Sequence, residues 1–397
     1  GASPEASSYL DKALDTIEAN AKVYSTDYKA LRTNAHAAID AAGARTPADT
    51  HPAIRKALAT LGDKHALLLD PAAAKLFNLP RTAKATGLLV VPPSGAVALV
   101  APGSPAAKAG IALGDRIVAV DGVAEFAALP TREFERLFRR GQRPDGSTAA
   151  LDLRLRSGTA EPRAVNVPLA AFDDYQAPTG RRLDNGIGYL ELPPVIGPKG
   201  AAYDDTVHEL LGQIDDGKLR GFVIDLRRNT GGTLWPMLVG IGPLAGDGKL
   251  GAFASATSGA DWTYDAAAGA ASSTGYELAK VDQPHPLRPD LPVAVLTSPL
   301  TTGAGEALVV AFSGRAHTRR FGEGTRGLPT SNTQKLLADG ALLLVTVTVH
   351  ADRTGKRYDS VIAPDEQVAT DWTRFGTADD PVLAAACRWI ATAKPAK

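Results

Sequence analysis

The 397-residue chain has a single cysteine, Cys387, so an intramolecular disulfide is excluded. It has no excess of charge, because 43 Lys and Arg balance 43 Asp and Glu. This balance removes the electrostatic case for a nucleic-acid partner or an anionic membrane surface. No apolar run approaches the roughly 20 residues of a membrane span. No residues show metal-ligand spacing, and we expect neither a metal nor a cofactor.

What is present is typical of a globular protein, with 44% apolar and 22% charged residues. The length suffices for two or three domains. The only methionine is Met237 and the chain begins with glycine, so a signal segment or lipid anchor could have been removed together with the initiator.

Three regions differ in hydrophobic periodicity. Residues 1–80 show helical spacing, for example at Leu10, Leu14 and Ile17. Residues 86–170 follow the period of strands, and residues 151–156 alternate strictly. Residues 175–397 alternate strands with helices, which predicts an α/β core. Within that core, the stretch 252–289 is rich in small and polar residues and is expected to hold loops and an edge hairpin.

The strand-rich region closely resembles a PDZ domain. The resemblance rests on Gly-Ser-Pro-Ala-Ala-Lys-Ala-Gly at 103–110 and on the strand and Asp-Gly turn at 114–122. Residues 132–139 fit the helix of the peptide groove, and 86–90 resemble the carboxylate-binding loop. The resemblance implies peptide binding at Gly87, Leu88 and Leu89. The alternative is a PDZ fold kept for packing or gating; peptide contact is favoured.

The sequence Thr-Thr-Gly-Ala-Gly-Glu at 301–306 lies between a buried strand and a helix. Such a turn can present one side chain at a helix N-terminus, where backbone N–H groups stabilise negative charge. The passage resembles the nucleophile turn of the C-terminal processing (tail-specific) serine proteases, which reads Thr-x-Ser-Ala-x-Glu. The serine position is occupied by Gly303.

The family resemblance implies a crotonase-like α/β protease core with an N-terminal helical region and an inserted PDZ-like domain. It also implies hydrolysis of peptides or unfolded proteins without a cofactor, and an extracytoplasmic location such as the bacterial periplasm or cell envelope. The oligomeric state stays open.

A second motif, Asp-Leu-Arg-Arg-Asn-Thr-Gly-Gly at 225–232, follows another buried strand. Two glycines there can leave backbone N–H groups bare, which suits an oxyanion hole. Taken alone, a helix-entry turn that needs glycine would be the better explanation. The similarity to the tail-specific pattern favours function, and it implies that the N–H groups of Gly231 and Ala304 are the oxyanion donors.

The general base departs from the commoner family pattern. Many members use a lysine whose position here is Leu328, and Arg326 cannot replace it because arginine stays protonated. A second branch, resembling the tricorn protease core, uses a histidine in Leu-Gly-x-x-His, which matches residues 61–65. This resemblance implies that His65 is the base and lies beside the Gly303 turn. Lys64 replaces a serine that helps to orient the histidine in that branch.

Asp359 precedes a closing Pro-Asp and is the candidate for a supporting acid, although an aspartate in a surface turn is the commoner explanation.

Glycine has no nucleophile, so Gly303 admits three interpretations. In the first interpretation, a natural serine was changed on purpose, which the vector-like start Gly-Ala-Ser makes plausible. In the second, the chain is a natural pseudoprotease that binds peptides without cutting them. In the third, the neighbouring Thr302 supplies the hydroxyl. The third ranks last, because a neighbouring residue in a tight turn points elsewhere, and a displacement of about 1 Å costs on the order of a hundredfold in rate.

Overall fold

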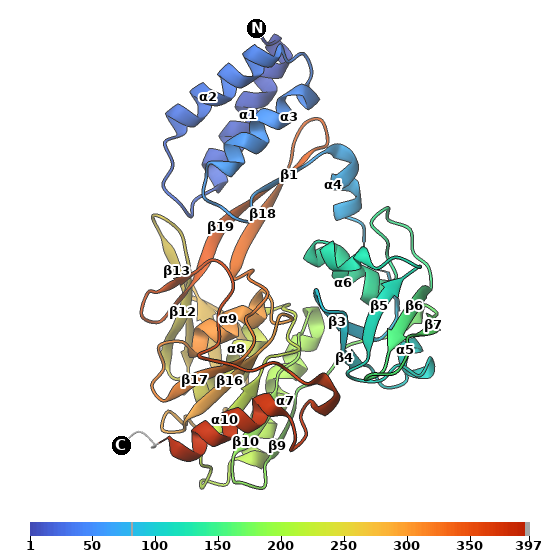
Figure 1. Cartoon of the computed structure of the whole chain (residues 1–397). Coiled ribbons are helices and arrows are strands. Elements are labelled where there is room, and N and C mark those ends of the chain that lie inside the picture. Colours follow the sequence, from blue (N-terminus) through green and yellow to red (C-terminus); the bar gives the residue numbers. More distant parts are fainter. Residues whose placement is uncertain (81, 394–397) are drawn as a thin grey trace.

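A computed structural model describes residues 1–80 and 82–393 and has the mixed α/β architecture expected from the sequence. A helical bundle lies at one end and the α/β core at the other (Figure 1). A long hairpin runs from the core to the bundle, and a β-rich unit lies beside the core (Figure 1). Among the described residues, no helix has the length and apolar character required to cross a membrane.

The N-terminal bundle is built on the hairpin tip. Its elements are α1 (Pro4–Asn20), α2 (Tyr28–Ala42), α3 (Pro47–Ala59), β1 (Leu67–Leu69) and α4 (Pro71–Phe77). Helix α1 begins where the Ser3 hydroxyl accepts the N–H of Ala6 at 3.1 Å. The bundle shares a buried cluster with the hairpin, and the Tyr9 hydroxyl donates to the Asp339 carboxylate at the hairpin tip at 2.6 Å.

The β-rich unit is a five-stranded antiparallel sheet with one main helix. Its elements are β2 (Lys84–Ala85), β3 (Leu88–Val91), β4 (Ala96–Val100), α5 (Pro105–Lys108), β5 (Arg116–Val120), α6 (Thr131–Arg140), β6 (Leu151–Arg156), β7 (Arg163–Val167) and β8 (Ala170–Ala171), with a 3-10 turn at Glu125–Ala128. The sheet order β3-β4-β5-β6-β7 leaves β3 at an edge, next to α6. The predicted tight turn is present at Asp121 and Gly122, whose φ angles are 51° and 79°.

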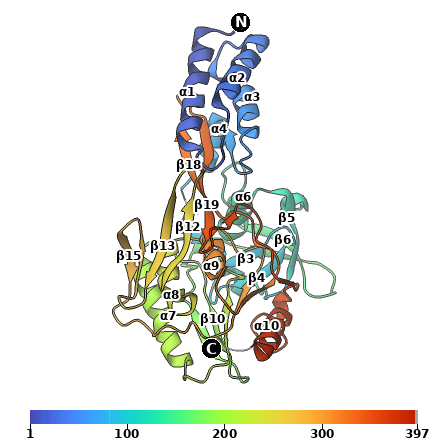
Figure 2. The same cartoon turned by 90° about the vertical axis from the view of Figure 1, so that its left-hand side faces the viewer.

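The core contains a six-stranded sheet between helices. Its elements are β9 (Thr179–Arg182), β10 (Gly188–Glu191), α7 (Gly200–Ile214), β11 (Phe222–Asp225), α8 (Leu234–Ala245), β16 (Val293–Thr297), α9 (Ala304–Phe312), β17 (Thr318–Gly322), β21 (Glu366–Gln367) and α10 (Pro381–Thr392), with 3-10 turns at Gly197–Lys199 and Trp372–Arg374. Helix α10 covers one face, and α7, α8 and α9 cover the other (Figures 1 and 2).

A second sheet covers the outer side of α8 and α9. Its strands are β12 (Gly248–Ala254), β13 (Gly259–Asp265), β14 (Ala270–Ser273), β15 (Tyr276–Lys280), β18 (Thr330–Leu336), β19 (Leu342–Asp352) and β20 (Arg357–Tyr358), with β1 paired to β19. The edge hairpin expected in 252–289 is present as β14 and β15, and residues 281–289 form a loop, but the hairpin is part of a longer antiparallel meander from β12 to β15 that was not expected. Alternate large residues, Trp262 and Tyr264, face the helices and are buried. Because most of their neighbours are small, the alternation is hard to see in the sequence.

The order of the parallel strands brings the two glycine motifs together. Strands β11 and β16 are adjacent and parallel, with Asp225 opposite Leu296. The turns that leave their carboxyl ends therefore meet at one edge of the sheet, where open α/β sheets usually bind ligands.

Candidate functional site

The Gly303 turn has the backbone of a nucleophile elbow. Gly303 caps α9 with φ 56° and ψ −111°, a conformation that residues with a side chain rarely adopt. A strained strand-to-helix turn of this kind exposes the nucleophile in serine hydrolases. A Cβ atom built at Gly303 meets no heavy atom of the described residues within 4 Å. A side chain at position 303 would therefore have room, at the expense of backbone strain.

Gly231 lies against this turn. A Cβ atom on Gly231 would be 3.2 Å from the Thr302 carbonyl oxygen and 3.7 Å from the Ala304 nitrogen, which leaves little room for a side chain. The Ala304 N–H is at the first position of α9, where no carbonyl within the helix can accept it. The Gly231 N–H, in contrast, donates to Asn229 Oδ1 at 3.0 Å. An oxyanion would have to compete with that amide oxygen for the Gly231 donor.

Side-chain hydroxyls join the two turns. Ser298 Oγ donates to the Arg227 carbonyl at 2.6 Å, and Thr301 Oγ1 donates to the Leu226 carbonyl at 2.8 Å. Thr302 Oγ1 donates to the Leu300 carbonyl at 2.8 Å. The Thr302 hydroxyl is thus directed back into its own turn, an orientation that argues against Thr302 as the nucleophile.

His65 lies in the turn between α3 and β1, and its Nε2 is 3.0 Å from the Asp359 carbonyl oxygen. Because a carbonyl oxygen only accepts, Nε2 carries the proton and Nδ1 keeps a lone pair. The Asp359 carboxylate accepts the Tyr24 hydroxyl at 2.6 Å and is 3.8 Å from the Lys64 ammonium. Asp359 therefore holds the histidine through its backbone, and the carboxylate has other partners.

A short series of hydrogen bonds connects His65 to the Gly303 turn. The segment after Asp359 pairs with the loop after β17, where Thr325 N–H donates to the Ile362 carbonyl at 3.1 Å. Arg326 N–H in that loop donates to the Thr301 carbonyl at 2.9 Å. These contacts support the pairing of His65 with Gly303, which stays a prediction.

Glu306 is a site residue that the sequence reasoning treated only as part of a pattern. Its carboxylate is completely buried and accepts the N–H groups of Gly327 at 2.6 Å and Leu328 at 2.8 Å. Burial raises the pKa of Glu306 to about 7, against the opposing effect of these donors. Glu306 therefore holds the loop that contains Gly327 and Leu328.

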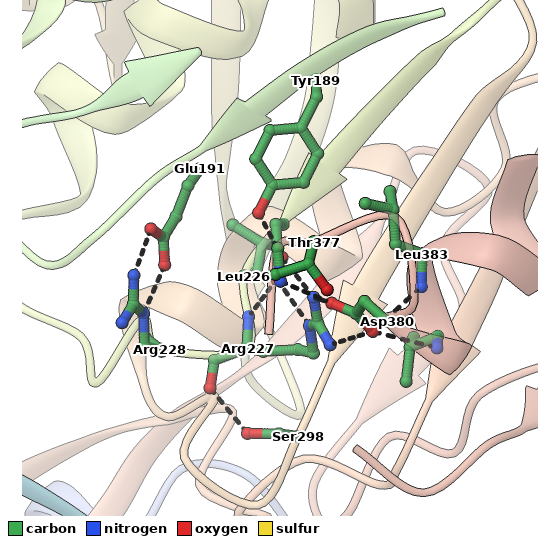
Figure 3. Close-up of polar contacts among 12 residues, drawn as sticks. Tyr189, Glu191, Leu226, Arg227, Arg228, Ser298, Thr377, Asp380 and Leu383 are labelled. Carbon is green, nitrogen blue, oxygen red and sulfur yellow. Dashed lines mark hydrogen bonds and ion pairs between the residues drawn. The ribbon is translucent and has the colours of Figure 1, made fainter. Parts of the chain in front are cut away.

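The Asp-Leu-Arg segment is built around a buried guanidinium (Figure 3). Arg227 binds Asp225 with Nη2–Oδ2 at 2.7 Å and Asp380 with Nη2–Oδ2 at 2.7 Å, and all three side chains are fully buried. The Tyr189 hydroxyl donates to Asp225 at 2.7 Å. Burial alone would raise the pKa of Asp225, but Arg227 holds it below its usual value. These residues are structural supports of the glycine turn that follows them.

The neighbouring Arg228 points the other way, toward Glu191 (Figure 3). It forms a two-bond pair with Glu191 at 2.6 and 2.5 Å and donates to the Ala98 carbonyl of β4 at 3.1 Å. Beside it is a cavity of about 510 Å³ between the PDZ-like unit and the core. Gly231 and the candidate peptide-binding residues all line the cavity, the latter being Gly87, Leu88 and Leu89.

Taken together, the structure has an α/β core, in which two glycine turns meet at one edge of the sheet, and an attached β-rich unit whose edge strand β3 lies beside α6. Residues 186–368 match the model of peptidase family S41, and residues 97–139 match the model of a PDZ domain. The chain is 27% identical over 364 residues to carboxyl-terminal-processing peptidase 2, chloroplastic, of Arabidopsis thaliana, covering 85% of this chain and 65% of that protein.

The chain is also 29% identical over 179 residues to the nisin-resistance protein of Lactococcus lactis subsp. lactis, covering 45% of this chain and 55% of that protein. The matches thus span less than two thirds of the length of these two relatives. A solved structure of a photosystem II D1 C-terminal processing protease has the same fold, with a TM-score of 0.59 and 21% identity over 92% of this chain and 94% of that one. Over residues 186–368 the chain is thus similar to the serine-type peptidases of family S41, and over residues 97–139 it is similar to PDZ domains.

We expect Arg227→Met to lower the free energy of unfolding by about 3 to 5 kcal/mol, because it leaves Asp225 and Asp380 buried without their cation. Urea unfolding followed by circular dichroism measures this loss. Arg228→Met serves as a control with a smaller expected loss, because Glu191 stays partly accessible to water. A loss below about 1 kcal/mol for Arg227→Met would contradict the supporting role of Arg227.

The raised pKa of Glu306 predicts a pH-dependent stability. A carboxyl group whose pKa rises on folding contributes its full stabilisation when the pH is below the pKa of the unfolded state, 4.5. This contribution is lost as the pH rises through the pKa of the folded state, about 7. Between pH 4.5 and about pH 7, the free energy of unfolding of the parent should fall by about 3 kcal/mol more than that of Glu306→Gln. This figure follows because each unit of pKa shift corresponds to about 1.4 kcal/mol. Urea unfolding across this pH range tests the difference, with the exposed Glu277→Gln as control. Parallel profiles for parent and Glu306→Gln would refute it.

Proposed function

We propose that this chain is a tail-specific protease that binds the ends of peptides or unfolded proteins, and that it is nearly inactive as it stands because position 303 has no hydroxyl. The observation that carries the proposal is the strained Gly303 turn, whose following amide, Ala304 N–H, has no acceptor within its helix. The proposed division of the chain is 1–80 helical, 86–170 PDZ-like and 175–397 protease core, located outside the cytoplasm.

With serine at position 303, the proposed chemistry proceeds as acyl transfer. The serine oxygen attacks the peptide carbonyl carbon, and His65 Nδ1 takes the hydroxyl proton, since Nε2 is bound to Asp359. The N–H groups of Ala304 and Gly231 receive the oxyanion, Gly231 leaving or sharing its bond to Asn229. His65 then returns the proton to the departing amine, and water hydrolyses the acyl-enzyme.

Gly303→Ser should restore serine hydrolase activity. Without the hydroxyl, the oxyanion donors and binding alone leave a residual acceleration of roughly a thousandfold to ten-thousandfold over water. The two forms are compared on an unfolded protein substrate and with a fluorophosphonate probe. Probe labelling of Gly303→Ser that is lost in Gly303→Ser/His65→Ala supports the scheme.

Two other outcomes identify the competing interpretations. Strong cleavage by the unaltered chain that Thr302→Val abolishes would make Thr302 the nucleophile. A folded Gly303→Ser form that neither cleaves nor reacts with the probe would favour a natural peptide-binding pseudoprotease.

Restoring the serine should cost stability. At φ 56° and ψ −111°, a residue with a side chain is strained by about 1 to 3 kcal/mol, and glycine relieves that strain. Gly303→Ser and Gly303→Ala should both lower the free energy of unfolding by this amount in urea titrations. Because alanine carries no hydroxyl, an equal loss in both variants assigns the cost to the backbone. Unchanged stability in both would show that the turn relaxes.

A further inference from the structure

His65 is held at two places, its ring and its backbone. The ring Nε2 donates to the Asp359 carbonyl oxygen at 3.0 Å. The backbone N–H of His65 donates to Asp63 Oδ1 at 2.9 Å, so an aspartate side chain closes the turn at residues 63–65. The Asp63 carboxylate therefore fixes the peptide plane of His65, separately from the bond that the ring makes.

The same carboxylate is bound to the long strand β19. Asp63 Oδ1 also accepts the Thr346 hydroxyl at 2.7 Å, and Asp63 Oδ2 accepts the Thr346 N–H at 2.8 Å. Thr346 is buried, with 2% of its surface exposed. Hydrogen bonds to an ionised carboxylate are stronger than those between neutral groups. Asp63 thus connects the backbone of His65 firmly to the middle of the hairpin.

Thr346 lies where β19 changes its partner along one edge. Strand β1 pairs with β19 at residues 342–344, and β12 pairs with it at residues 349–352. Between these two partners, the Thr346 N–H has the Asp63 carboxylate as its acceptor in place of a strand carbonyl. If the β1 register continued by two residues, His65 would lie opposite Thr346. The carboxylate therefore ends the strand pairing at the point where the histidine has to leave it.

The acceptor of the ring is attached to the same strand. Asp359 follows directly after β20, and β20 pairs with β19 at residues 350–351. The backbone and the ring of His65 are therefore held at two points of β19. A rotation of the His65 turn has to break the bonds to Asp63 or the bond to Asp359.

We propose that Asp63 is a positioning residue for His65: its carboxylate fixes the His65 backbone to Thr346 and so keeps the Nδ1 lone pair in one direction. The inference rests on the proposed function, in which Nδ1 takes the hydroxyl proton of a serine at position 303. Without the Asp63 carboxylate, the turn loses this attachment to β19. The ring can then rotate away from Asp359, and its proton can move between the two nitrogens.

Nitrogen NMR of the unaltered chain tests the positioning without requiring any activity. The protein is labelled with 15N-histidine, and the His65 signals are assigned by their loss in His65→Gln. At a pH where the ring is neutral, the parent should show a single tautomer with the proton on Nε2. Asp63→Ala and Thr346→Val should both give His65 signals averaged between the two tautomers. Thr346→Val is the milder variant, because the Thr346 N–H remains available to Asp63.

Each of the two substitutions has a matched control. Thr348→Val removes a hydroxyl from the same strand that has no hydrogen-bond partner among the described residues. Asp70→Ala removes a carboxylate that caps α4 through the Ala73 N–H at 2.8 Å, shortly after His65 in the chain. Both controls should leave the His65 tautomer as it is in the parent.

Kinetics in the Gly303→Ser background separate a positioning role from a structural one. Asp63→Ala and Thr346→Val should lower kcat and leave KM unchanged, because His65 acts on substrate that is already bound. A displacement of the base by about 1 Å corresponds to a loss on the order of a hundredfold in kcat. The double variant should lose no more than Asp63→Ala alone, because both substitutions remove the same contact. Urea unfolding of each variant measures the accompanying loss of stability.

The outcomes separate the inference from the function on which it rests. An unchanged His65 tautomer and an unchanged kcat in Asp63→Ala and Thr346→Val would overturn the inference, even if stability falls. The proposed function would survive that result as long as probe labelling of Gly303→Ser is lost on His65→Ala. A changed tautomer in a chain whose Gly303→Ser form neither cleaves nor reacts with the probe would overturn the proposed function. In that case Asp63 would still be the group that holds His65.

Discussion

The architecture of the site depends on one buried cation. Arg227 neutralises Asp225 at the end of β11 and Asp380 at the start of α10, so it fixes the strand end to a helix 153 residues away. Its carbonyl oxygen accepts the Ser298 hydroxyl from the neighbouring turn. Two buried carboxylates without this partner would carry a desolvation cost of several kcal/mol each. The ion network fixes Arg227 at the start of the glycine turn, and the hydrogen bond from Ser298 joins the segment before Gly303 to Arg227. The two turns therefore keep their relative position.

The strain at Gly303 and the preorganisation around it are separate features. Oxyanion donors act because they are already oriented before reaction, and the Ala304 amide is oriented by α9 whether or not a hydroxyl is present. The strained dihedral angles are imposed by the strand-to-helix connection between β16 and α9, and glycine tolerates them without cost. In the proposed function, glycine in place of serine at position 303 therefore removes the hydroxyl while relieving strain in the scaffold. This explains how the complete turn geometry can persist in a chain without a nucleophile.

Sequence patterns predicted the elements whose conformation is determined by residues close together in the chain. The strand, Asp-Gly turn and groove helix of the PDZ-like unit were readable because periodicity and turn residues specify them. In 252–289 the edge hairpin was expected, but the full meander from β12 to β15 was not, because small residues hide the alternation of its other strands. The function of Asp359 was assigned to its carboxylate, whereas its carbonyl contacts His65 across 294 residues. Glu306 gave no distinct signal either, since its partners, Gly327 and Leu328, are set by the packing of a distant loop.

Two adjacent arginines couple the peptide groove to the candidate active site. Arg227 points into the core, and Arg228 points to the PDZ-like unit, where it donates to the Ala98 carbonyl. The Phe375 ring lies against both guanidinium groups, with centroid distances of 4.3 and 4.2 Å. Since Gly231 is only three residues further along, a displacement of the PDZ-like unit has to break the Arg228 contact or strain the turn that carries the Gly231 amide. The proposed peptide groove and the proposed oxyanion donor are thus connected through two consecutive residues of one motif.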